Sequence, residues 1–119
     1  MNYTLDAGAL IALERGRDEV VRIVQRMATL TVPSTVVAQV WRSPRQVVLS
    51  RFLSLPHVEI AGLDGDDARA IGLLLAASGT TDVVDAHVVL TAALRNRAVV
   101  TSDPDDLLKI DPRLELLVV

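Results

Sequence analysis

Residues 2–14, NYTLDAGALIALE, decide the fold, because a short strand, a carboxylate and a helix follow one another without a linker. Asn2 to Leu5 predicts a first strand that ends at Asp6, and Ala7 to Glu14 predicts a helix that stops at Arg15-Gly16. A charged residue directly after a buried strand has no packing reason to be there. Asp6 is therefore the first candidate for a functional site, with capping of the next helix as the alternative.

Strands and helices alternate along the rest of the chain. Further strands are expected at Leu30–Val32, His57–Ala61, Ala98–Thr101 and Leu114–Val118, and further helices at 18–27, Val36–Arg42, Arg45–Ser54, 66–78, Val83–Arg95 and Pro104–Lys109. The helices at 36–42 and 45–54 are expected to form a hairpin. Such alternation predicts a mostly parallel sheet covered by helices on both faces, with the site at the carboxyl ends of the strands. We expect one domain over residues 1–119.

Composition narrows the function classes. Half of the 119 residues are apolar, enough for one core, but no apolar run approaches the roughly 18 to 20 residues that span a bilayer. The first residues also lack the zones of a signal peptide, so we expect a cytoplasmic protein with no membrane partner. With no cysteine and only two histidines, a metal would have to be held by oxygen. The formal charge of −3 means that any nucleic acid must be held locally.

Three carboxylates are expected near the carboxyl ends of the predicted strands, where the site should lie. Asp6 ends the first strand, Asp103 follows the strand at 98–101, and Asp85 lies in the first turn of the helix that opens near Asp82. Clustered carboxylates repel one another unless a cation offsets their charge, and hard oxygen ligands favour Mg²⁺ or Mn²⁺. Magnesium lowers the pKa of a bound water and stabilises charge on a phosphodiester, so the expected reaction is phosphodiester hydrolysis.

Four segments in this order resemble the PIN domains, especially the VapC-type toxins of bacterial toxin–antitoxin pairs. They are LDAGALIAL at 5–13, VPSTVVAQVWR at 32–42, DVVDAH at 82–87 and VVTSD at 99–103. The resemblance spans nearly the whole chain. It implies a PIN-like three-layer α/β/α sandwich, divalent-metal ribonuclease activity on an RNA substrate, a homodimer, and a cognate antitoxin that blocks the site.

The resemblance places Asp6, Asp85 and Asp103 at three of the four acidic positions of the family and Thr101 at its hydroxyl position. At the fourth position Gln39 stands where a glutamate is typical, and its neutral amide is expected to weaken metal affinity. We hypothesise that Asp82, on the same helical face as Asp85, restores the missing charge. The expected metal site is therefore formed by Asp6, Asp85, Asp103 and Asp82, with Gln39 and Thr101 as further catalytic positions.

Several of these residues also have structural explanations. Asp82 and Asp85 are favourable at a helix N-terminus, by roughly 0.3 to 1 kcal/mol each. Asp103 could cap the following helix, in which Asp105 and Asp106 are expected to be solvated first-turn acids. His87 is expected to be a hydrogen-bonded structural histidine rather than a general base.

Two other function classes compete with a ribonuclease toxin. If Gln39 disables metal binding, the chain would bind RNA or an antitoxin without efficient turnover. A phosphoacceptor signalling domain also carries clustered aspartates on an α/β fold. It fits poorly, because Asp6 is unpaired and Lys109 lies beyond the last acidic strand end.

Overall fold

The computed structural model describes residues 2–26, 29–95 and 98–119, and the strands among them form one parallel sheet. The strand order is β3-β2-β1-β4-β5, and every neighbouring pair is parallel. The strands are β1 (Asn2–Leu5), β2 (Thr29–Pro33), β3 (Val58–Ala61), β4 (Ala98–Thr101) and β5 (Leu116–Val118). The prediction of a mostly parallel sheet is confirmed, and β1 lies at its centre.

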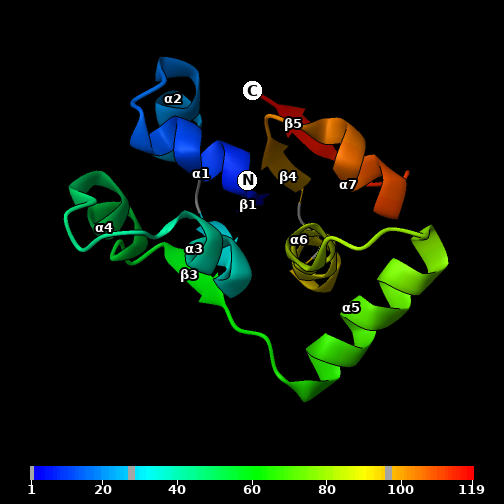
Figure 1. Ribbon diagram of the computed structural model, residues 1–119. Coiled ribbons are helices and arrows are strands. Elements are labelled where there is room, and N and C mark those ends of the chain that lie inside the picture. Colours follow the sequence, from blue (N-terminus) through cyan, green and yellow to red (C-terminus); the bar gives the residue numbers. More distant parts are fainter. Residues whose placement is uncertain (1, 27–28, 96–97) are drawn as a thin grey trace.

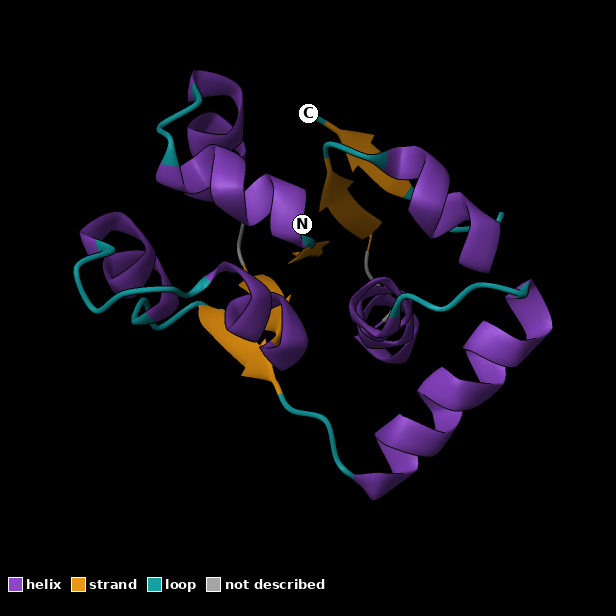
Figure 2. Cartoon of the chain, viewed as in Figure 1, coloured by secondary structure: helices purple, strands orange, loops and turns teal. Residues whose placement is uncertain are grey.

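Helices cover both faces of this sheet. They are α1 (Ala7–Glu14), α2 (Asp18–Arg26), α3 (Ser34–Val40), α4 (Val47–Leu53), α5 (Gly65–Ser78), α6 (Val83–Arg95) and α7 (Pro104–Ile110). In Figure 1, α1, α2 and α4 lie on one side of the strands, and α5, α6 and α7 lie on the other. Figure 2 shows the strands, in orange, between these two groups of helices. The predicted α/β/α arrangement is therefore confirmed.

Predicted and observed elements differ mainly around α3 and α4. Helix α3 begins at Ser34, directly after Pro33, and α4 begins only at Val47. The intervening loop is held by the Gln46 amide, which accepts a backbone N–H bond from Ser43 at 2.9 Å and donates to Glu14 at 2.7 Å. The expected hairpin is corrected by this arrangement, because α3 packs against α1, α6 and β2 while α4 packs against α1 and β3, and the two helices contact each other only weakly. The expected end of the second helix at position 27 lies outside the described residues.

The core lies around β1 and β4 and fixes the helices that carry the carboxylates. All four residues of β4 are buried, and α6 buries one face against β1 and β2. Each fully buried Leu or Val side chain stabilises the fold by roughly 1.5 to 3 kcal/mol. No single described helix is long and apolar enough to cross a membrane. Only α5 and α6 taken together meet that length and composition, with a bend of 109° between them.

Candidate active site

Asp6 ends the central strand and links it to two neighbours. One carboxylate oxygen accepts a hydrogen bond from the backbone N–H of Ala9 at 2.9 Å, which caps α1. The other accepts from the Thr101 hydroxyl at the end of β4, the strand next to β1. The side chain is buried, with 6% exposed. Burial raises the pKa of Asp6 above its ordinary value, although the hydrogen bonds from Thr101 and Ala9 act in the opposite direction. The capping and site interpretations of Asp6 are thus compatible.

Thr101 connects Asp6 to Asp103. Its hydroxyl donates to Asp6 and accepts the backbone N–H of Asp103 at 3.0 Å. Asp103 occupies the N-cap position of α7, yet its side chain makes no capping hydrogen bond. The alternative that the Asp103 side chain caps α7 is therefore wrong, and its exposed carboxylate interacts with Asp106 instead.

Asp85 lies in the first turn of α6, among other carboxylates. Burial raises its pKa to about 6, and the charges of Asp82, Asp106, Asp6 and Asp103 add to that rise in this order. Asp82 itself is exposed, and its side chain accepts the backbone N–H of Asp85 at 3.0 Å. The helix-terminal explanation of Asp82 is confirmed by this bond. Asp82 also contributes negative charge to Asp85, as the site hypothesis requires.

Asp106 belongs to the same cluster and was missed by the sequence interpretation. Its charge is the largest cause that raises the pKa of Asp103, and it also raises the pKa of Asp85. With Asp82 and Asp85 it lines a hollow of about 280 Å³ between the start of α6 and α7. Lys109 lines this hollow too, 3.5 Å from Asp106. Asp106 is an exposed acid in the first turn of α7, as expected, and its charge acts on Asp85 and Asp103 in addition. Its place one turn after Asp103 is the signal that could have identified it.

Gly8 keeps the space beside Asp6 free of side chain. A Cβ atom at Gly8 would lie 2.1 Å from Ser102 Oγ and 3.6 Å from the Asp6 carboxylate. Such a contact with Ser102 is shorter than real Cβ atoms show, so Ser102 would have to move. Glycine thus lets the Ser102 hydroxyl occupy the space between the start of α1 and the end of β4.

Gln39 is exposed on α3, and no hydrogen bond joins it to the described acidic side chains. The neighbouring Trp41 is half-buried against the core and borders a separate hollow between α3 and α4. The structure thus connects Asp6, Asp85, Asp103, Asp82 and Thr101 through hydrogen bonds or mutual charge effects, but not Gln39.

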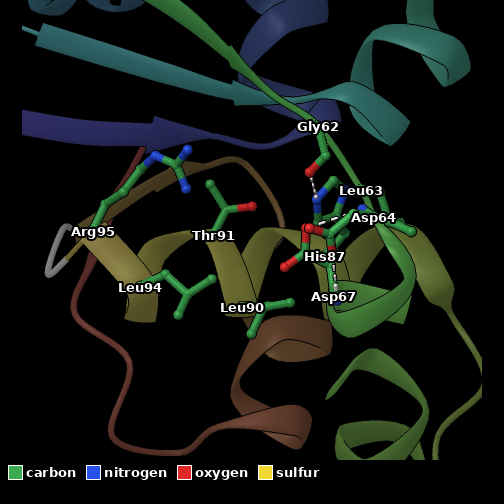
Figure 3. A pocket seen from close by; sticks show the side chains of 9 residues that line it. All are labelled: Gly62, Leu63, Asp64, Asp67, His87, Leu90, Thr91, Leu94 and Arg95. Atoms are coloured by element: carbon green, nitrogen blue, oxygen red, sulfur yellow. Dashed lines mark hydrogen bonds between the residues drawn. The ribbon is translucent and has the colours of Figure 1, made fainter. Parts of the chain in front are cut away.

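The His87 side chain on α6 is held by hydrogen bonds to two other segments of the chain. Its Nδ1 atom accepts the Thr35 hydroxyl at 2.8 Å, and its Nε2–H donates to the Gly62 carbonyl at 3.2 Å. Figure 3 shows the ring at one end of a pocket of about 420 Å³, with Arg95 at the other end. Burial lowers the pKa of His87, which favours the neutral ring. The expectation of a partnered histidine is confirmed, and the ring ties α6 to α3 and to the loop after β3.

The donor set fits a hard divalent cation. Among the described residues no group of three or more His, Cys, Asp or Glu side chains is arranged to hold a metal ion directly. Mg²⁺ does not require such a cage, because it usually retains several waters and binds one or two carboxylates together with substrate phosphates. Burial first, and then the charges of neighbouring carboxylates, raise the pKa of Asp85, and a cation would relieve the second of these two causes. Asp6, Asp85 and Asp103 are the residues that would hold the ion.

Comparisons with known proteins agree with this geometry. The PIN domain family matches residues 3–111 of the chain. Among solved structures, the chain resembles VapBC2 from Rickettsia felis bound to a promoter DNA fragment, with 21% identity, a TM-score of 0.70, and coverage of 100% of this chain and 99% of that one. It also resembles a toxin–antitoxin complex from Klebsiella pneumoniae, with 18% identity, a TM-score of 0.75 and coverage of 98% and 96%.

A third similar structure is FitAcB from Neisseria gonorrhoeae, with 19% identity, a TM-score of 0.68 and coverage of 98% and 96%. No match was found among curated protein sequences. At these identities the solved structures establish the fold, whereas the family match covers most of the sequence itself. The chain therefore belongs to the PIN domain family.

Proposed function

We propose that this protein is a divalent-metal-dependent endoribonuclease and the toxin of a toxin–antitoxin pair. The observation that supports the proposal best is the carboxylate cluster at the ends of β1 and β4, where four acidic neighbours help to raise the pKa of Asp85 to about 6. A bound Mg²⁺ or Mn²⁺ would neutralise this charge, activate water and stabilise the phosphodiester as it is cleaved.

The residues of the chain have distinct roles in this proposal. Asp6, Asp85 and Asp103 hold the cation. The Thr101 hydroxyl holds Asp6 in place and lowers its pKa against the effect of burial, since a hydrogen bond to a carboxylate favours its charged form. Asp82 orders the first turn of α6 through the N–H of Asp85 and adds charge. Gln39 is proposed to contribute only a neutral amide, so the cluster on α6 and α7 supplies the charge that a glutamate would bring.

The proposed partners follow from the family and from the similar structures. VapBC2 and the Klebsiella pneumoniae protein are toxin–antitoxin assemblies, and we expect this chain to bind a cognate antitoxin that covers the site. We also expect a cytoplasmic homodimer. Leu73 on α5 and Leu94 on α6 are the most exposed large apolar side chains of the described residues, at 72% and 65%, and suit a self-complementary surface. Light scattering of wild type and Leu94→Glu tests the dimer, which the variant should dissociate.

A second function is favoured by one observation, the neutral and exposed Gln39. In this alternative the domain binds RNA or an antitoxin and turns RNA over poorly. The two functions differ in metal-dependent chemistry, because a pure binding domain needs no cation for its contact with RNA.

The decisive experiment is cleavage of total cellular RNA by the purified protein, freed of any partner, with Mg²⁺ or with chelator. We expect cleavage that chelator abolishes and that Asp6→Asn and Asp85→Asn each reduce by at least about 100-fold, in the range usual for loss of a group that acts on the reacting atoms. Asp66→Asn is the matched control, because this acid is 94% exposed and pairs only with Arg69 at 3.7 Å.

Metal binding is measured separately by calorimetric titration with Mn²⁺, so that a folded but inactive protein is recognised. Binding that weakens in Asp85→Asn and Asp82→Ala but not in Asp66→Asn would support the cluster. Unchanged binding in Asp82→Ala would refute the charge assigned to that residue. Equal, metal-independent cleavage in wild type and Asp6→Asn would favour the binding-only function, and Gln39→Glu would then be the variant to test for gained activity.

A further inference from the structure

The acidic cluster creates a problem for an anionic substrate that the cation alone does not solve. The chain carries a formal charge of −3, so its net charge does not attract RNA. The hollow on the α6 and α7 side of the site is lined by Asp82, Asp85 and Asp106, and its one lysine, Lys109, is close to Asp106. The RNA backbone therefore needs cationic contacts on another side of Asp6.

A second hollow, of about 280 Å³, opens on that other side, along α1. Its lining residues Gly8, Ile11, Ala12 and Arg15 recur at the spacing of one helical face. It begins beside the site, since Gly8 lies against Ser102 and near the Asp6 carboxylate. At 1.5 Å per residue, Gly8 and Arg15 are about 10 Å apart along the helix axis. We call this hollow, completed by Arg17 and Ser102, the α1 groove.

The charge of the α1 groove is opposite to that of the acidic hollow. It contains two arginines and no carboxylate. Arg15 is exposed and forms no ion pair with the described residues, and Arg17 approaches only Glu19, at 3.9 Å on the half-exposed surface. The acid next to Arg15 in sequence, Glu14, is engaged by the Gln46 amide at 2.7 Å. Both guanidinium groups are therefore available to an anion, and arginine suits bidentate contacts with phosphate.

We propose that the α1 groove binds the ribose-phosphate backbone of the RNA next to the cleaved bond, with Arg15 and Arg17 as phosphate contacts and Ser102 at the end nearest Asp6. The inference rests on the proposed ribonuclease function and adds to it the side from which the RNA chain enters the active site. The apolar floor of Ile11 and Ala12 suits the sugar rather than a second charge. The RNA chain then runs from the α1 groove to the carboxylates, instead of across the hollow lined by Asp82, Asp85 and Asp106.

The test is binding of a short fluorescent single-stranded RNA of mixed sequence, measured by anisotropy in chelator so that no turnover occurs. We expect Arg15→Gln and Arg17→Gln to weaken binding several-fold each. For single strands the logarithm of affinity falls with the logarithm of salt by about 0.7 per phosphate contact, so the double variant should lose about 1.4 from that slope. Arg15→Lys should keep the slope but lose part of the affinity, because it retains the charge without the planar fork.

Arg113→Gln is the matched control, since this side chain is 93% exposed and lies outside the groove. A double variant with the same affinity and salt slope as Arg113→Gln would overturn the proposal. The same holds if the double variant loses binding to a copurified antitoxin while RNA binding stays unchanged, which would assign the groove to a protein partner. Cleavage that neither chelator nor Asp6→Asn reduces would contradict the proposed ribonuclease function. If the arginine variants still bind RNA more weakly than the wild type in that case, RNA binding by the α1 groove is supported independently of that function.

Discussion

The hydrogen bond from Thr101 to Asp6 can be tested with two buried threonines on adjacent strands. Thr101 and Thr4 are both fully buried, on β4 and β1. The Thr101 hydroxyl donates to a buried carboxylate, whereas the Thr4 hydroxyl finds no hydrogen-bond partner among the described residues. Replacing either by valine keeps the shape and removes one hydroxyl, so the pair separates the hydrogen bond from the packing.

The expected magnitudes differ in sign. A hydrogen bond to a charged group contributes about 1.5 to 3 kcal/mol, so Thr101→Val should lower the free energy of unfolding by about 2 kcal/mol at neutral pH. The part-buried Asp103 N–H also loses its acceptor in this variant, which adds to the loss. For a chain of this length the change corresponds to a fall in Tm of about 8 °C. Thr4→Val should be neutral or stabilising by up to about 1 kcal/mol, since it removes an unpaired buried hydroxyl.

Urea unfolding followed by circular dichroism, in chelator, measures both variants. The Thr101 hydroxyl favours ionised Asp6, so the deficit of Thr101→Val should shrink as acidification protonates Asp6. Equal losses in Thr4→Val and Thr101→Val would refute the reasoning, because packing alone would then explain both. A Thr101→Val deficit that is unchanged at acidic pH would show that the bond does not depend on the carboxylate charge.

Three further predictions concern the same site. The pKa of Asp85 is raised to about 6 in the folded state from an ordinary value of 3.8, so between these values the folded state binds a proton that the unfolded state has lost. The free energy of unfolding should therefore fall as pH rises from about 4 to about 6. Asp85→Asn should flatten this pH profile, measured by urea unfolding. Added Mg²⁺ should raise the Tm of the wild type at neutral pH and have a smaller effect on Asp85→Asn, and equal shifts in a thermal melt would contradict binding at this cluster. Gly8→Ala should change stability by less than about 1 kcal/mol, because rotation of the Ser102 side chain relieves the 2.1 Å contact of its Oγ with the new Cβ while Ala favours the helix, and it should reduce RNA cleavage because the Ser102 hydroxyl is displaced beside Asp6. Gly72→Ala, with open space on α5, should stabilise by about 0.5 to 1 kcal/mol in the same unfolding assay.

The parts of the fold that could be predicted from sequence are those set by local chemistry. The strand before Asp6 and the helix after it occur at the predicted residues, since a buried β segment, a capping carboxylate and an Ala-rich helix are adjacent in the chain. The start of α4 was less predictable. It depends on the Gln46 side chain, whose partner Glu14 is 32 residues away. Such a contact leaves no periodic pattern in the sequence.

The candidate site shows the same division. Asp6 and Asp103 could be placed together because each comes just after a strand, and the carboxyl ends of neighbouring parallel strands meet at one edge, whereas Thr101 was predicted only from the family resemblance. Asp106 could not, because its position among the carboxylates depends on how α7 packs against α6. As a first-turn acid it has a sufficient local explanation, and only the tertiary structure adds the second one.

In the proposed function, the distribution of charge would let an acidic protein act on RNA without the glutamate typical of its family. Charges separated by more than about 8 Å are largely screened from one another at physiological ionic strength. Arg15 lies about 10 Å along α1 from Gly8, so a phosphate held there interacts mainly with the arginines and little with the acids on α6 and α7. In the proposed function, the carboxylates would hold the cation without a charge from Gln39. Substrate binding and metal binding would then depend on opposite charges on opposite sides of Asp6, and the net charge of the chain would constrain neither.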